Sequence, residues 1–183
     1  MLVTIVIAGV LLVALLGFAA TRPDTFEVKR TQIVQASPER IFAQIEDFRN
    51  WAAWSPFEKF DPAMTKTYSG AARGKGAEYR WAGNQKAGQG AMEIVEAAPP
   101  ALVRIRVDFS RPFQAHNIAE FTLETKGSST AVTWAMRGPQ PFPFKLMSIF
   151  LSMDKMVGKD FEEGLAKLKA LTESSKSFSA KGA

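Results

Sequence analysis

LVRIRVDFSRPFQAHNIAEFTLE, residues 102–124, contains two runs in which apolar and polar side chains alternate, joined by a turn at Arg111-Pro112. A period of two is typical of strands with one buried and one exposed face. The predicted inward positions are Val103, Ile105, Val107 and Phe109 in the first run, and Asn117, Ala119, Phe121 and Leu123 in the second. The predicted outward positions are Arg104, Arg106 and Asp108, then His116, Glu120, Thr122 and Glu124. The stretch therefore predicts two adjacent antiparallel strands.

The same alternation continues on both sides of this pair. Further candidate strands span residues 26–34, 66–69, 77–82, 91–97 and 130–137, and turn-rich segments separate them. Short strands with regular punctuation predict an antiparallel meander, here of about seven strands. By the same alternation Tyr79, Trp81, Trp134 and Met136 face inward.

Helical signals precede and follow the predicted sheet. Ser37-Pro38-Glu39 has the residues preferred at a helix start, with Ser as N-cap and Pro in the first turn. A second short helix is predicted at 47–57, and one long helix from just after Pro143 to about Glu173. A long amphipathic helix and a sheet bury their apolar faces against each other, so the chain is predicted to be α+β. Residues 174–183 are small and polar and are predicted to be a disordered tail.

The N-terminus is a separate segment. Residues 2–20 contain no charged side chain, and a helix of this length reaches roughly 29 Å, enough to span a bilayer core. No Lys or Arg precedes the apolar run, which favours a retained anchor over a cleaved signal peptide. Arg22, Lys29 and Arg30 follow it, and flanking cations favour the cytoplasmic side. We expect an anchor at 1–20, a linker at 21–25 and a folded domain at 26–173.

Composition excludes several chemistries. The chain has no Cys and one His, so thiolate, iron–sulfur and tetrahedral zinc sites lack ligands, and we expect no metal and no cofactor. Its net charge of +5 comes from Lys and Arg scattered among acids, whereas nucleic-acid binding proteins cluster their cations. We therefore expect no nucleic-acid partner.

Five motifs together resemble a known family. They are residues 36–42 (ASPERIF), residues 47–56 with Trp51 and Trp54, Gly74 to Trp81, Val132 to Trp134, and residues 160–169 (DFEEGLAKLK). This combination resembles the START-like helix-grip (SRPBCC) superfamily, especially its polyketide cyclase/dehydrase members, over residues 26–173. The resemblance implies a curved sheet that grips the long helix around a hydrophobic ligand cavity.

Alternation and the helix pattern indicate which residues would line such a cavity. Large aromatic and Met side chains collect on the inward face, and Asn117 is a polar residue among them. Met147, Met153 and Met156 suit an adaptable lip. Asp160 is predicted at the edge of the helix's apolar face, and His116 on the solvent side. The predicted ligand-binding residues are Tyr79, Trp81, Phe109, Asn117, Phe121, Trp134, Met136, Phe150 and Met153.

Three functions are compatible with this sequence. The first is a membrane-tethered module that binds a lipid or other hydrophobic small molecule in its cavity, with the membrane as partner through residues 2–20. The second is a cyclase- or dehydratase-like enzyme that uses Tyr79, Asn117 or Asp160 on an apolar substrate. The third is a co-chaperone-like interaction module with a filled core. The sequence contains no recognisable catalytic constellation, which favours the first.

Overall fold

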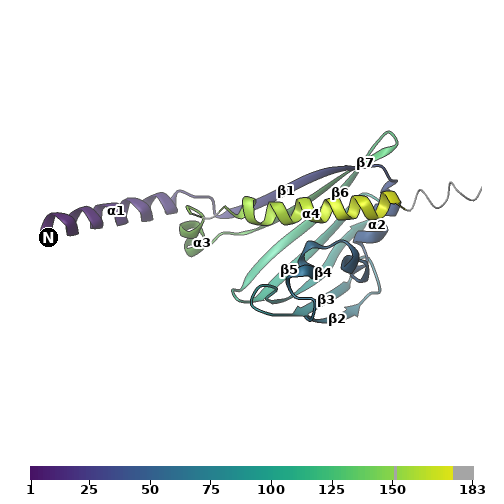
Figure 1. Cartoon of the computed structure of the whole chain (residues 1–183), viewed down its shortest axis with the longest axis horizontal. Helices are drawn as coiled ribbons and strands as arrows, with labels where there is room; N and C mark the ends of the chain where they lie inside the picture. The colour runs from purple at the N-terminus through teal and green to yellow at the C-terminus, as the bar shows by residue number, and fades with distance from the viewer. Residues whose placement is uncertain (151, 175–183) are drawn as a thin grey trace, which may run out of the picture.

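Seven strands form a single antiparallel sheet, and helices lie at its ends and on one face (Figure 1). The computed structural model describes residues 1–150 and 152–174. Its helices are α1 (Leu2–Ala20), α2 (Pro38–Ile45), the 3₁₀ helices η1 (Phe48–Ala53) and η2 (Pro56–Phe60), α3 (Phe142–Met147) and α4 (Met153–Ser174). Its strands are β1 (Thr25–Val34), β2 (Thr65–Gly70), β3 (Ala77–Ala82), β4 (Gln89–Ala98), β5 (Leu102–Arg111), β6 (Ala115–Lys126) and β7 (Ser129–Pro139).

The order of the strands in the sheet follows the chain, with one exception. β2 to β7 are consecutive neighbours, and β1 pairs with β7, so the order is β1-β7-β6-β5-β4-β3-β2. α4 packs along β1 and crosses the same face as η1 and η2. This arrangement is the α+β helix-grip fold expected from the sequence.

The register confirms the predicted faces of the two decisive strands. Val103 pairs with Phe121, Ile105 with Ala119, and Val107 with Asn117. All six side chains are at most 6% exposed and belong to the inner face. On the outer face Arg104 donates hydrogen bonds to Glu120 at 2.8 and 2.9 Å. Alternation succeeds here because one face of each strand is fully covered and the other meets solvent.

A stack of three aromatic rings joins the sheet to α4. The Trp134 ring lies 4.8 Å from that of Phe121 on β6 and 4.0 Å from that of Phe161 on α4, with Trp134 and Phe161 almost parallel. Gly164 makes this approach possible, because a Cβ there would lie 2.9 Å from the Trp134 ring and 2.8 Å from Pro56. Gly164 is therefore the point at which α4 packs closely against the sheet and η2.

The N-terminal turn of α4 is fixed by an arginine from the sheet. Arg30 on β1 donates to both carboxylate oxygens of Asp154, at 2.7 and 3.0 Å, and to Glu162 at 2.6 Å. The guanidinium lowers the pKa of the Asp154 carboxyl, chiefly by hydrogen bonding. Such bidentate pairs fix orientation as well as contributing energy.

The prediction of one long helix from just after Pro143 to about Glu173 is wrong in one respect, because the structure has two helices there, α3 and α4. Ser148 Oγ donates to the Lys145 carbonyl oxygen at 2.7 Å, and the chain turns at 148–150. Ser152 Oγ then accepts from the Lys155 N–H at 3.3 Å and caps a new helix. Ser174 ends α4, and the rest of the predicted tail, 175–183, lies outside the described residues.

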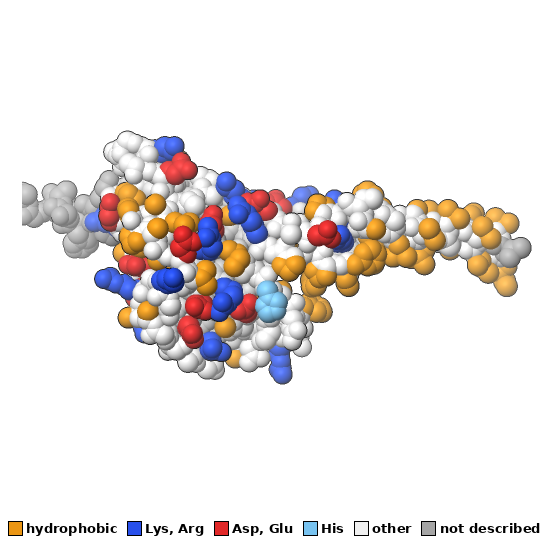
Figure 2. All heavy atoms as spheres, turned by 180° about the vertical axis from the view of Figure 1, so that it is seen from behind, with side chains coloured by type: hydrophobic (Ala, Val, Ile, Leu, Met, Phe, Trp, Pro, Cys, Tyr) orange, Lys and Arg blue, Asp and Glu red, His pale blue; other side chains and the backbone are white. Residues whose placement is uncertain are grey.

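α1 projects away from the domain, and Figure 2 shows apolar side chains along its length. The window Val3–Ala20 has a mean hydropathy of 2.8, and 6% of it is buried. A membrane anchor and a signal sequence both have these properties. Only the base of α1 contacts the domain: Ala19 is fully buried, and α1 packs against α3. The junction is further fixed by an ion pair of 2.5 Å between Lys145 and Asp24.

Candidate functional site

A cavity of about 540 Å³ lies between the inner face of the sheet, the 3₁₀ helices, α3 and the first half of α4. Its wall is mainly aromatic, Met and aliphatic. The volume falls within the range of roughly 300–1,000 Å³ that is usual for small-molecule sites, and such sites are typically apolar with a few placed polar groups. α4 packs mainly along β1, so the inner faces of β3, β4 and β5 contribute to the cavity wall instead of being covered by this helix.

Seven of the nine residues predicted from the sequence line this cavity. They are Tyr79, Trp81, Phe109, Asn117, Trp134, Met136 and Met153. Phe121 does not, because Trp51, Trp54 and Trp134 cover its ring and leave it 0% exposed. Phe150 is also outside the wall: the break between α3 and α4 places it in a turn, where it is 73% exposed.

Other lining residues were missed by the sequence reasoning. Phe26, Phe57, Met64 and Met92 contribute to the wall, as do Phe144 and Val157 from the helices. Met92 could have been found, because it pairs with Tyr79 on one side and Val107 on the other and therefore shares their face. The suggested methionine lip, Met147, Met153 and Met156, lies in the wall as a group.

Three buried polar atoms in this wall have no hydrogen-bond partner within residues 1–150 and 152–174. They are Tyr79 Oη, Asn117 Oδ1 and Trp134 Nε1. The three residues are 6%, 6% and 2% exposed. Buried polar atoms normally have partners, and leaving one unsatisfied costs about 1–3 kcal/mol. The residues of the wall therefore hold two unpaired donors, on Tyr79 and Trp134, and one unpaired acceptor, on Asn117, all three packed against neighbouring protein atoms.

The protonation state of Tyr79 makes it a donor at neutral pH. Burial raises the pKa of its hydroxyl well above the ordinary value of 10, and the nearby Glu58 carboxylate raises it further. Glu58 itself forms an ion pair with Lys66 at the edge of the site. The Tyr79 hydroxyl thus keeps its proton and can donate a hydrogen bond, and the nearby Glu58 carboxylate is one acceptor within the protein.

The opening of the cavity is marked by lining residues that are also exposed. Phe113 in the β5–β6 turn is 64% exposed, Met147 at the end of α3 is 42% exposed, and Met156 in α4 is 56% exposed. The Phe113 ring contacts that of Phe144 edge-on at 5.9 Å, so the turn and α3 meet at this opening. The inner end is formed by buried residues such as Trp51 and Ala119.

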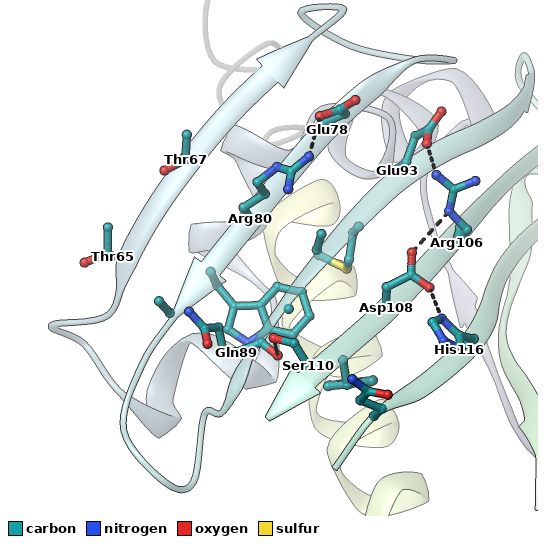
Figure 3. A pocket seen from close by; sticks show the side chains of 17 residues that line it. Thr65, Thr67, Glu78, Arg80, Gln89, Glu93, Arg106, Asp108, Ser110 and His116 are labelled. Atoms are coloured by element: carbon teal, nitrogen blue, oxygen red, sulfur yellow. Dashed lines mark hydrogen bonds and ion pairs between the residues drawn. The ribbon is translucent and has the colours of Figure 1, made fainter. Parts of the chain in front are cut away.

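The outer face of the sheet carries a second, more open pocket with charged side chains, which shares Trp81, Met92, Phe109, Gln114 and His116 with the cavity wall (Figure 3). Arg106 contacts Glu93 and, at 3.2 Å, Asp108, and His116 Nδ1 lies 2.7 Å from the second Asp108 oxygen. His116 is therefore on the solvent side, as predicted, with a side chain that is 78% exposed. These charges neutralise one another along the sheet. Asp160, which was predicted at the edge of the helix's apolar face, lies 3.5 Å from Lys59 and outside the cavity wall.

These features define a class: a helix-grip domain with a mostly apolar internal cavity. The family model described as "Polyketide cyclase / dehydrase and lipid transport" matches residues 25–173. The chain belongs to this family, which confirms the resemblance stated from the motifs. No curated protein matches the sequence.

Solved structures show the same fold at low identity. A Nitrosospira multiformis protein has a TM-score of 0.60 and 16% identity, with 82% of this chain and 99% of that one covered. A Chromobacterium violaceum protein has a TM-score of 0.57 and 18% identity, over 83% and 99%. The major latex-like protein 151 of Panax ginseng has a TM-score of 0.55 and 13% identity, over 82% and 99%. Identities this low establish the fold alone.

Proposed function

We propose that this protein binds a lipid or another hydrophobic small molecule in the cavity while α1 tethers it to a membrane. The observation on which this rests is an open, mostly apolar cavity of about 540 Å³ inside an otherwise well-packed domain. Protein interiors are usually packed without such voids, so a cavity of this size is a feature that function must explain. Lipid transport in the family description supports the same conclusion.

The three unpartnered polar atoms specify the ligand further. A pure hydrocarbon would leave Tyr79 Oη, Asn117 Oδ1 and Trp134 Nε1 unsatisfied. Once a side-chain rotation turns one or more of them toward the cavity, a hydroxyl, carbonyl or carboxyl group of an amphiphile would pair with it. The apolar part of the amphiphile would fill the aromatic and Met-rich remainder. We therefore propose an amphiphile that enters with its polar group inward.

We also propose that α1 is retained as an anchor and that the domain is cytoplasmic. α1 contains no charged side chain and only 6% of its window Val3–Ala20 is buried, which suits lipid surroundings. Arg22, Lys29 and Arg30 follow the span and support the cytoplasmic side.

Ligand extraction tests the binding proposal. Residues 21–183 contain the core cluster, which extends from Val28 to Leu168, so this segment is expressed without α1 for the test. We expect native mass spectrometry to show about one amphiphile per chain, released into organic solvent and absent from an Ala119→Trp variant that fills the cavity. A wild-type domain that stays unliganded after exposure to a total lipid extract would contradict the proposal and favour an interaction module. Turnover of an apolar substrate that Tyr79→Phe abolishes would instead favour the enzyme.

The polar anchor has its own test. Asn117→Leu should weaken binding of a hydroxylated or carboxylated probe about tenfold, since one hydrogen bond is lost. The same variant should bind a purely hydrocarbon probe as well as the wild type or better. Equal losses for both probes would indicate a general packing defect and contradict the anchor role.

A further inference from the structure

Five large apolar residues are exposed on the segments that border the opening of the cavity, which are the β5–β6 turn, α3 with the turn after it, and the start of α4. We call Phe113, Phe142, Met147, Phe150 and Met156 the apolar rim; their exposed fractions range from 42% to 73%. Among the described residues after α1, the other exposed large hydrophobic residues are Ile33 and Ile118. Exposed apolar side chains scattered singly are normal, whereas a cluster rimmed by polar residues marks an interaction surface.

The apolar rim lies at the end of the domain from which α1 leaves. Phe142 and Met147 belong to α3, which packs against the base of α1. The Asp24 carbonyl accepts from the Gln140 N–H at 2.6 Å, and the Asp24 carboxylate pairs with Lys145, so the short linker is fixed on α3. Figure 2 shows apolar side chains continuing from α1 onto this end of the domain. The rim and the span therefore form one continuous apolar surface.

The charges around the rim are complementary to an anionic lipid surface. Lys86 and Arg111 are exposed at the mouth of the cavity, and Lys155 is exposed in the first turn of α4. Two acids at this end are engaged by cations of the domain: Asp24 by Lys145 and Asp154 by Arg30. Apolar side chains flanked by basic ones are typical of surfaces that insert into the membrane interface, and each nearby cation adds about 1 kcal/mol on an anionic leaflet.

We propose that the apolar rim docks on the bilayer beside α1, so that the mouth of the cavity opens directly onto one leaflet. This inference rests on the proposed function, and it adds the route by which the ligand enters. An amphiphile then moves from leaflet to cavity without its chain crossing water. The base of α1 fixes the domain in this orientation through α3, so docking needs no separate membrane-binding domain.

Docking can be measured directly, because the full chain contains no Cys and accepts a single engineered one. Phe150→Cys is labelled with an environment-sensitive dye, and the full-length protein is reconstituted in phosphatidylcholine–phosphatidylglycerol vesicles with nitroxide-labelled lipid. We expect strong quenching at position 150 and little at a matched Ile33→Cys label, since Ile33 lies on β1 away from the rim. A Phe142→Cys label provides a second position if the first disturbs folding. Quenching at 142 and 150 no greater than at 33 would overturn the proposal.

Ligand entry is tested with variants of rim residues that do not line the cavity. Transfer of a dansyl-labelled lipid from the host vesicle into the cavity is measured by energy transfer from the cavity tryptophans. In the full chain, the double variant Phe142→Gln, Phe150→Gln should slow this transfer about tenfold. Ile33→Gln with Ile118→Gln, which removes the two large exposed apolar side chains outside the rim in the described part of the domain, should leave the rate unchanged. Equal rates in both double variants would overturn entry through the rim.

A third arm separates this proposal from the proposed function. A short-chain dansyl fatty acid is supplied from solution, so it reaches the cavity without a membrane. If the wild type binds this probe but the rim is not quenched, docking is wrong and the proposed function stands. If the rim is quenched but the wild type binds no probe, the proposed function is wrong and the entry route falls with it, whereas the docking surface stands.

Discussion

Gly138 on β7 provides the space that the Asn117 amide occupies. A Cβ at Gly138 would lie 1.9 Å from Asn117 Oδ1, closer than any non-bonded contact allows. The neighbouring pairs Val107–Asn117 and Phe26–Gly138 place both residues in one row across the inner face of the sheet. The orientation of the proposed polar anchor therefore depends on a residue that has no side chain.

Gly138→Ala should displace the Asn117 side chain. We expect a loss of about 1–3 kcal/mol in the free energy of unfolding, the usual range for overpacking, together with weaker binding of an amphiphilic probe. Urea unfolding measures the first quantity. The double variant Gly138→Ala, Asn117→Ala should recover most of the stability, because the clash is removed. Additive losses in the two variants would show that the residues are not coupled.

Truncation of Trp54 should reduce the stability of the domain without affecting ligand binding. It is 0% exposed and does not line the cavity, and its ring lies 4.9 Å from that of Trp51 and 5.8 Å from that of Trp134. We expect Trp54→Ala to cost about 3–5 kcal/mol through lost burial and a new void. Denaturant titration decides, and a loss below about 1.5 kcal/mol would mean that this ring is not part of the core.

Acid should remove a stabilising contribution from Glu163. Hydrogen bonds from Lys59 and Lys167 lower the pKa of its carboxyl from 4.5 to about 2. A carboxyl with a lowered pKa takes up its proton at a lower pH in the folded state than in the unfolded state. Its contribution to the free energy of unfolding is therefore present above about pH 4.5 and is lost as the pH falls toward 2. Thermal unfolding should show Glu163→Gln less stable than wild type at pH 7, with the gap closing in acid. Glu39→Gln, on an exposed turn of α2, is the control, and a gap independent of pH would contradict the assignment.

The N-terminal segment should remain on the mature protein. We expect N-terminal sequencing to find residues before Ala20, and protease added to intact spheroplasts to leave the domain uncut, because the positive charges follow the span. A mature chain that begins at Ala20 or Thr21 would identify α1 as a signal sequence. Digestion in intact spheroplasts would reverse the orientation without affecting retention.

The alternation of apolar and polar residues in the sequence was sufficient to predict the sheet and its inner face, but not the residues at the opening of the cavity. Alternation placed Tyr79 and Asn117 on the inner face because each strand has one covered side. The same rule put Phe121 in the wall, although the tryptophans of η1 and the loop after it cover its ring; alternation gives the face of a residue and not what packs over it. The division between α3 and α4 depends on Ser148 and Ser152 bonding to nearby backbone, which apolar periodicity does not register. Phe150 was misplaced for that reason.

The most direct test of ligand binding compares two tryptophan substitutions on one strand. Ala119 is 5% exposed and lines the cavity, whereas its neighbour Ile118 faces outward and is 38% exposed. Residues 21–183 are titrated with a dansyl fatty acid, and energy transfer from the native tryptophans gives affinity and stoichiometry. The account predicts saturable binding near one probe per chain in the wild type and in Ile118→Trp, and its loss in a folded Ala119→Trp variant. Absence of saturable binding in the wild type, or unchanged binding in Ala119→Trp, would contradict it.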